Sequence, residues 1–201
     1  MIQNVANIFR IEELRRRILI TVGLLAVYRL GFHVPLPGVS MESLANRAGG
    51  GPGGDLLGLI NVISGGGILS LAVFSLGIMP YISSSIIFSL LAKVVPALER
   101  LSKEGSSGQR KINQYTRYST VPICLIQAIF IVNGVLKPGV YGEYVDPMTY
   151  NAWWFAPMVM LTLTAGTIFL MWLGEQITER GVGNGISLLI MAGIVARVPV
   201  G

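Results

Sequence analysis

The chain has few side chains able to carry out chemistry, and their spacing fits no catalytic site. His33 is the only histidine and Cys124 the only cysteine of the 201 residues, so these residues supply neither a His/Cys metal cluster nor a disulfide. Glu175 and Glu179 share a helix face and in principle could exchange protons, but Arg180 beside them favours an interfacial ion pair. We therefore expect no enzyme and no cofactor.

The residues that follow Glu175 and Glu179 match no catalytic motif either. Gly181, Gly183 and Gly185 match neither GxGxxG nor GxxxxGK[ST], so they predict a tight turn between helices rather than a phosphate loop. Ser187 has no partner base in a matching segment, so an intramembrane serine hydrolase is not expected.

The composition predicts a membrane protein. Hydrophobic residues make up 52% of the chain and charged residues 12%, against about 25% charged in a typical soluble domain. Runs of 37, 28 and 19 residues carry no charge, at 56–92, 147–174 and 118–136. A membrane span needs about 20 mainly apolar residues. We expect an all-α polytopic membrane protein.

Five transmembrane helices are predicted, at about 18–34, 68–92, 118–136, 153–174 and 185–201. The first apolar run could also belong to a signal peptide, but Arg29 interrupts it and no small-residue cleavage site follows, which favours a retained span. Trp153 and Trp172 lie about 28 Å apart along the fourth helix, which is the thickness expected of an aromatic belt.

The longest uncharged run exceeds one span, since 37 residues would form a helix about 55 Å long. Ser64 to Gly67 break this run and leave a short apolar segment at about 55–64. Two interpretations stay open at this point. The segment is either a re-entrant element, which must be buried in protein or line a cavity, or a short helix on the outer surface.

The distribution of positive charge predicts the orientation. Eleven of the 15 basic residues precede the first span or lie in the loops after the second and fourth. Cytoplasmic loops are rich in Lys and Arg, so residues 1–17 are expected to be cytoplasmic. The loop at 93–117 is either a solvated connection or a docking surface, and its basic residues are Arg100, Lys103, Arg110, Lys111 and Arg117.

Two pairs of isoleucines and one amide complete the candidate residues. Ile78 and Ile82 stand four residues apart, and Ile186 and Ile190 repeat this spacing, so each pair shares a helix face. Such pairs serve packing, lipid contact or a pore lining. Gln127 lies within the third span, where an amide either bonds a neighbouring helix or lines a pathway.

Several long stretches resemble the SecY family, which forms the channel of the bacterial protein translocase. They are FRIEELRRRI (9–18), YRLGFHVPLPG (28–38), SLGIMPYISSSII (75–87), KEGSSGQRKINQYTRY (103–118) and LTAGTIFLMWLGEQITERGVGNGIS (163–187). Members of this family are built from two inverted halves of about five spans each, and this chain resembles the first half.

The resemblance implies roles for particular residues. Segment 55–64 resembles the plug that seals the resting channel, with Leu56, Leu57, Leu59, Ile60, Asn61 and Ile63. The hydrophobic pore ring would contain Ile78, Ile82, Ile186 and Ile190. Ser83 and Gln127 would belong to the lateral gate, where a signal sequence moves towards lipid.

The resemblance also implies a function. The channel would translocate unfolded polypeptides across the inner (plasma) membrane and insert apolar helices sideways into lipid, without covalent chemistry. Its partners would be SecE, SecG, the SecA ATPase or the ribosome, signal sequences and the bilayer. No nucleic acid is expected to bind except through ribosome docking. The alternative is half of an inverted-repeat transporter for a small solute, which would place a polar or charged site near mid-membrane.

Overall fold

The computed structural model describes residues 12–39, 71–138 and 145–195. Its helices are α2 (Glu12–Gly31), α6 (Met79–Val94), α7 (Pro96–Lys103), α8 (Ser106–Phe130), the π-helix η1 (Ile131–Val135), α9 (Pro147–Tyr150), α10 (Phe155–Arg180) and α11 (Gly185–Val195). Within these ranges, strand-type pairing is limited to one bridge between Pro35 and Ala72. The expected all-α class is confirmed.

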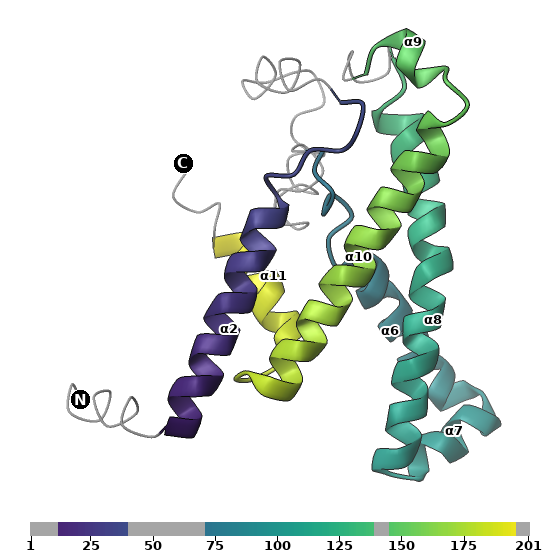
Figure 1. Ribbon diagram of the computed structural model, residues 1–201. Helices are drawn as coiled ribbons and strands as arrows, with labels where there is room; N and C mark the ends of the chain where they lie inside the picture. The colour runs from purple at the N-terminus through teal and green to yellow at the C-terminus, as the bar shows by residue number, and fades with distance from the viewer. Residues whose placement is uncertain (1–11, 40–70, 139–144, 196–201) are drawn as a thin grey trace.

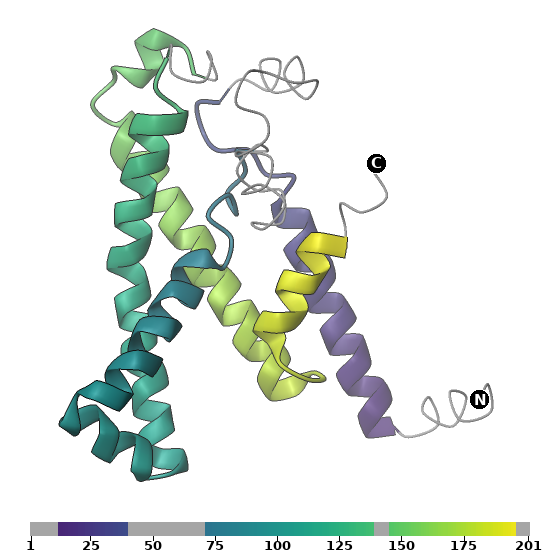
Figure 2. The same ribbon diagram turned by 180° about the vertical axis from the view of Figure 1, so that it is seen from behind.

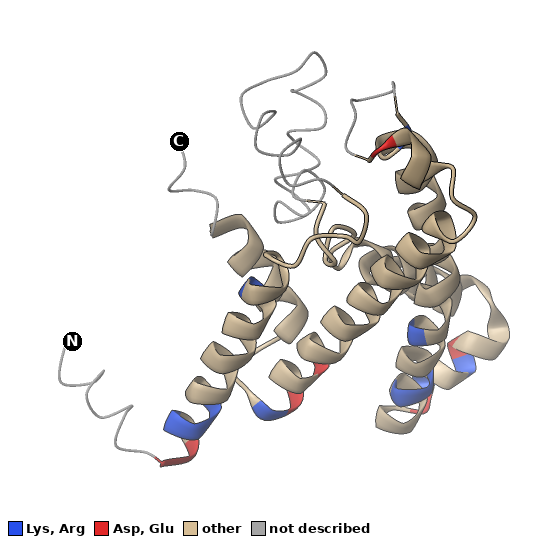
Figure 3. Ribbon diagram, turned by 45° about the horizontal axis from the view of Figure 1, so that its top comes forward, with Lys and Arg blue, Asp and Glu red and all other residues tan. Residues whose placement is uncertain are grey.

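The long helices alternate in direction (Figures 1 and 2). In Figure 1, α2, α8 and α11 run upward, whereas α6 and α10 run downward. The α10 helix packs against α8, α11 and α2, and α6 packs against α8. Most Lys and Arg residues gather at the lower end of the molecule in Figure 1, where α2 starts, α10 ends and α7 meets α8, as the colours of Figure 3 show. This is the end that the sequence predicts to be cytoplasmic.

Two helices, Ser106–Val135 and Phe155–Arg180, are long and apolar enough to cross a membrane. The pair α6 and α7 would form a third span if it is counted as one element, although it bends by 98°. Among the described residues, α11 is apolar but only 11 residues long, and α2 begins with the charged residues Glu12 to Arg17. The expected count of five spans therefore stays a prediction.

The second predicted helix begins later than expected. Residues 71–78 form turns, and α6 starts only at Met79. Pro80 occupies the first turn of α6, where its missing N–H costs no helical hydrogen bond. Leu71 and Gly77 have positive φ angles of 41° and 57°, which a right-handed helix does not allow. The expectation of helix over 71–78 is therefore wrong.

The basic segment 93–117 is a helical hairpin and not the expected loop. Pro96 starts α7, and Val95 before it is extended, as the steric effect of a following proline requires. Gly105, with φ of 74°, then allows the turn into α8. The first turns of α8 bury Gly108, Ile112 and Thr116, a four-residue spacing typical of a helix packed on one face.

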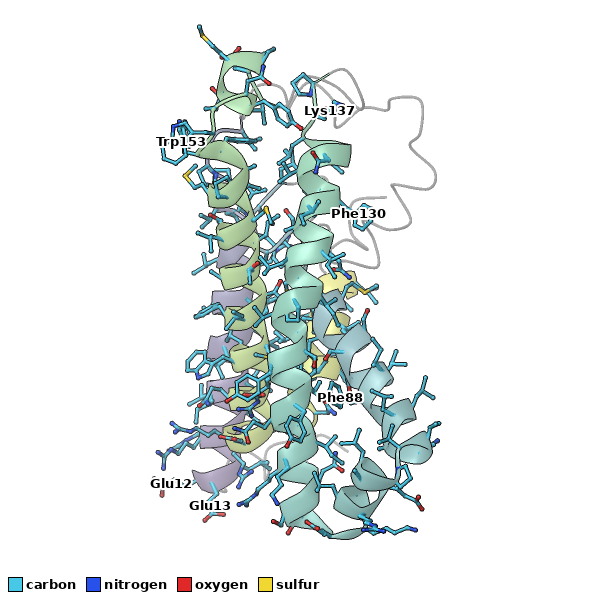
Figure 4. The ribbon with its side chains drawn as sticks, turned by 90° about the vertical axis from the view of Figure 1, so that its right-hand side faces the viewer. Glu12, Glu13, Phe88, Phe130, Lys137 and Trp153 are labelled. Carbon is cyan, nitrogen blue, oxygen red and sulfur yellow. The ribbon has the colours of Figure 1, made fainter. Side chains whose placement is uncertain are left out.

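Aromatic side chains project outward at the upper end of the molecule (Figure 4). Trp153 is 88% exposed and Phe130 is 72% exposed, whereas Glu12 and Glu13 lie at the opposite end in the same view. The aromatic belt expected from Trp153 and Trp172 stays a prediction.

Candidate functional site

The four isoleucines predicted for the pore ring meet in one apolar cluster. Ile78 is 6% exposed and precedes the first turn of α6, and Ile82 lies one turn further along that helix. Ile186 and Ile190 approach from α11. The buried members of this cluster, here called the ring cluster, are Tyr28, Phe74, Ile78, Leu170, Leu173, Ile177 and Leu189. The structure thus joins two pairs that lie about a hundred residues apart in sequence.

The two isoleucines of α11 are positioned by close backbone packing on α10. A Cβ atom on Gly185 would overlap the carbonyl oxygen of Gly174, and a Cβ atom on Gly174 would overlap the Ile186 side chain. At Gly185 the neighbouring atom is backbone, so only glycine allows this approach. At Gly174 it is the end of the Ile186 side chain, which can shift. The register of Ile186 against α10 is therefore set by backbone contact rather than by a flexible side chain.

The turn before α11 is held by side-chain hydrogen bonds. The Asn184 carboxamide oxygen accepts from the backbone N–H groups of Ile186 at 3.1 Å and Ser187 at 3.3 Å, which makes Asn184 the N-cap of α11. The Thr178 hydroxyl accepts from the Gly185 N–H and donates to the Gly174 carbonyl, each at 2.8 Å. The tight interhelical turn predicted from the glycine pattern is confirmed.

Thr21 on α2 holds the same turn from the other side. Its hydroxyl accepts from the Val182 N–H at 3.1 Å and donates to the Arg17 carbonyl at 2.9 Å. Gly181 lies so close that a Cβ atom there would meet the Thr21 hydroxyl at 2.5 Å. Sequence reasoning missed Thr21, because a single threonine in an apolar helix carries no signal of a partner 161 residues away.

The turn segment 71–78 is anchored before it delivers Ile78 to the ring cluster. The Leu36 N–H donates to the Leu71 carbonyl at 2.8 Å, and the Val73 N–H donates to the Val34 carbonyl at 3.0 Å. The Phe74 ring packs between Phe32 and Phe169, with ring centroids 5.8 and 5.9 Å away. This irregular backbone is almost wholly buried in protein, as irregular backbone at membrane depth must be.

The predicted gate residues Ser83 and Gln127 lie half-buried on α6 and α8. No hydrogen bond among the described residues joins Ser83 to Gln127, and the hydrogen bond between these two helices is made by Ser84. Its hydroxyl donates to the Thr116 carbonyl at 2.8 Å, an oxygen that also accepts from the Thr120 hydroxyl at 2.8 Å. The four-residue spacing of Thr116, Thr120, Cys124 and Ala128, all buried in α8, was the available signal for this helix face.

The basic residues of the hairpin have two different environments. Arg100, Lys103, Arg110 and Lys111 are exposed on α7 and the start of α8, and Lys103 pairs with Glu99 of its own helix at 2.6 Å. Arg117 instead joins α8 to α10, since its Nε lies 2.5 Å from the Glu175 carboxylate. Of the two carboxylates expected to form interfacial ion pairs, Glu175 does so, with Arg117 as its partner.

The predicted plug lies outside the described residues. This applies to Leu56, Leu57, Leu59, Ile60, Asn61 and Ile63 alike. Its role stays a prediction.

The described helices have the fold of solved protein-conducting channels. The chain superposes with a TM-score of 0.62 on a protein reported as "The structure of a protein conducting channel", covering 91% of this chain and 36% of that one at 18% identity. The same values hold for Sec61 in the canine ribosome–channel complex from the endoplasmic reticulum. The likeness therefore defines the class by fold, an all-helical chain with the fold of these channel proteins.

The sequence comparisons identify the family within this class. A family model described as SecY matches residues 72–201. The protein translocase subunit SecY of Escherichia coli K12 is 48% identical over 188 residues, which cover 93% of this chain and 41% of that protein. The SecY subunit of Streptomyces coelicolor is 44% identical over 209 residues, covering 99% and 46%. This chain belongs to the SecY family, and it spans less than half the length of these relatives.

Proposed function

We propose that this chain forms the first half of a channel that passes unfolded polypeptides across a membrane and releases apolar helices into lipid. The observation that carries the proposal is the convergence of Ile78, Ile82, Ile186 and Ile190 from α6 and α11 in one apolar cluster. Membership of a family whose relatives are translocase subunits supports it.

The proposed role of the pore ring follows from its apolar side chains. An apolar constriction excludes water and so blocks ions while no chain is passing. Isoleucine side chains also form contacts with any polypeptide, because dispersion contacts need no particular sequence. The glycine contact beneath Ile186 keeps the ring in place when a chain presses on it.

Two neighbouring segments complete the proposed channel. Residues 55–64 would close the ring from the outer side as a plug. The wall formed by α6 and α8, with Ser83 and Gln127, would be one side of the lateral gate. Both helices expose apolar side chains, including Ile87 on α6 and Ile126 on α8, which suits a surface that meets lipid or an apolar signal sequence.

The proposed partners follow from the charge distribution and the family. SecE and SecG would be the membrane partners. The SecA ATPase or the ribosome would dock at the basic end, where Arg100, Arg110 and Lys111 are exposed. That end would be the cytoplasmic side of the inner membrane. A structural neighbour reported in a ribosome–channel complex supports the ribosome as one such partner.

The transporter alternative is disfavoured by the same cluster. A solute site would need charged or polar groups at its centre, whereas the four residues proposed to line the pore, Ile78, Ile82, Ile186 and Ile190, are all apolar. The relatives are named as translocase subunits, which agrees with the expectation that the chain is not an enzyme.

Disulfide capture of a stalled polypeptide tests the proposal. A full-length SecY channel with this chain as its first half, in a Cys124→Ala background, would carry Ile82→Cys or Ile190→Cys. A precursor stalled in transit and bearing one cysteine should form a disulfide with either position. The control is Ile87→Cys, which lies on α6 about 140° around the helix from Ile82 and is 46% exposed. Equal capture at 82 and 87, or none at 82 and 190, would contradict the proposed pore.

A photocrosslinking experiment tests the proposed lateral gate. A photocrosslinker at Ser83 should capture a stalled signal sequence, and one at Lys111 should not. Capture of a small solute with no signal sequence would favour the transporter.

A further inference from the structure

The two segments that carry the proposed pore ring both pack on α10, and each contact is made at a glycine. Gly166 and Gly174 are buried residues of α10. A Cβ atom on Gly166 would overlap the backbone carbonyl of Val73 in the turn segment 71–78, and the carbonyl of Gly174 would be overlapped by a Cβ atom on Gly185 at the start of α11. The α10 helix is therefore the common support of both pairs of isoleucines.

The Gly166 contact fixes the main chain of the turn segment and not merely a side chain. The Val73 N–H donates to the Val34 carbonyl at 3.0 Å, so this residue is held on the side away from α10 as well. The next residue, Phe74, stacks on Phe169 of α10 with ring centroids 5.9 Å apart. A main-chain carbonyl cannot rotate away as a side chain can, so a larger residue at position 166 would displace the turn segment itself.

The turn segment transmits such a displacement to the ring isoleucines of α6. The Gly77 N–H donates to the Phe74 carbonyl at 2.8 Å, and the Ile82 N–H donates to the Ile78 carbonyl at 3.0 Å. The backbone from Val73 to α6 is thus a series of hydrogen-bonded turns, and close-packed interiors transmit displacements rather than absorb them. Ile78 and Ile82 would move with Val73.

We infer that Gly166 is a positioning residue for the pore ring, because it admits the Val73 carbonyl and so sets where Ile78 and Ile82 lie relative to the two isoleucines of α11. This inference rests on the proposed function. An apolar constriction blocks ions only while it stays dry, and a radial gap of about 0.5–1 Å forfeits roughly a quarter to a half of the dispersion attraction. A larger residue at 166 would loosen the ring without changing any of its four side chains.

Ion flux through the resting channel tests the inference. The full-length SecY channel with this chain as its first half is reconstituted into vesicles, and the efflux of chloride and of the much larger dye calcein is measured without a precursor. The variant is Gly166→Ala. The matched control is Gly23→Ala, the same change within α2 at a site where a Cβ atom meets nothing within 4 Å. Both variants gain the higher helix propensity of alanine, so this contribution is common to them.

Gly166→Ala should raise the chloride efflux several-fold and leave the calcein efflux at the parental level, because a small displacement opens a gap that only ions can pass. Gly23→Ala should change neither. Adding Ile82→Met to Gly166→Ala should lower the chloride efflux again, since the flexible methionine side chain fills irregular gaps. A residue needed only for folding would give neither this size selectivity nor this rescue.

A chloride efflux in Gly166→Ala equal to that of the parental channel would overturn the inference. Equal rises in chloride and calcein efflux would overturn it too, because they indicate a disrupted fold, and so would a chloride efflux that Ile82→Met leaves unchanged, because the ions would then bypass the ring.

If Gly166→Ala does not assemble, Phe74→Leu takes its place. This variant keeps an apolar side chain but loses the stack on Phe169, so the turn segment is held less firmly and chloride efflux alone should rise. No rise would overturn the inference. A parental channel that translocates no precursor would instead refute the proposed function, so translocation is measured first.

Discussion

The two helix pairs that carry the candidate residues are joined in different ways. The α10 and α11 helices meet through glycine backbones, a capped turn and the Thr21 hydroxyl. The α6 and α8 helices meet mainly through side chains, with one interhelical hydrogen bond, from Ser84, in the described part of the chain. Backbone contact leaves no room for sliding, whereas side-chain contact can readjust. We therefore expect the α10–α11 junction to tolerate substitution less well than the α6–α8 junction.

The largest effect is expected at the glycine contact. Gly185→Ala should destabilise the fold by about 3 kcal/mol or more, because the new methyl group would overlap the Gly174 carbonyl. The measurement is the free energy of unfolding in a denaturing-detergent titration. Gly23→Ala is the matched control, since a Cβ atom there meets nothing within 4 Å, and it should be neutral or slightly stabilising. Similar losses of unfolding free energy in the two variants would contradict a close backbone contact between α10 and α11.

A smaller loss of stability is expected where α2 contacts the turn between α10 and α11. Thr21→Val keeps the shape but leaves the Val182 N–H without its acceptor, so it should cost about 1–2 kcal/mol. Thr21→Ser keeps the hydroxyl and should recover most of this loss. The same titration measures both variants, and an equal loss in the two would show that packing, not the hydrogen bond, makes this contact.

A still smaller loss of stability is expected at the α6–α8 junction. Ser84→Ala should cost about 0.6 kcal/mol, the average measured for interhelical hydrogen bonds in membranes, because the Thr116 carbonyl keeps its bond from Thr120. Ser83→Ala, one residue away, should change nothing measurable. A loss at Ser84 as large as that at Thr21 would show that α6 and α8 are joined as firmly as α10 and α11.

The smallest effect is expected on α7. Glu99→Gln breaks the 2.6 Å pair with Lys103, whose side chain is 74% exposed, so it should cost less than about 0.5 kcal/mol. The effect should vanish in high salt, which the detergent titration can measure directly.

Local sequence signals predict the turn between α10 and α11 more accurately than the starts of α6 and α8. The glycine pattern at 181–185 predicts a tight turn, and turn geometry depends on neighbouring residues alone. The sequence does not predict the start of α6 at Met79, because the apolar residues in 71–78 resemble the rest of the span. The polar start of α8 resembles a loop in sequence, because the buried face of this helix is formed partly by small residues such as Gly108 and Thr116.

The amino-acid sequence by itself determined the all-α class, the charge-rich end, the α10–α11 turn and the resemblance to a channel family, since these depend on composition, short motifs and matching stretches. Tertiary structure alone decided which residues meet. It placed Ile78, Ile82, Ile186 and Ile190 in one apolar cluster. It also gave Ser84 the hydrogen bond between α6 and α8, tied Thr21 to Val182, and paired Arg117 with Glu175. The physical reason is that such contacts depend on how distant helices pack, and packing is set by the shapes of many side chains together.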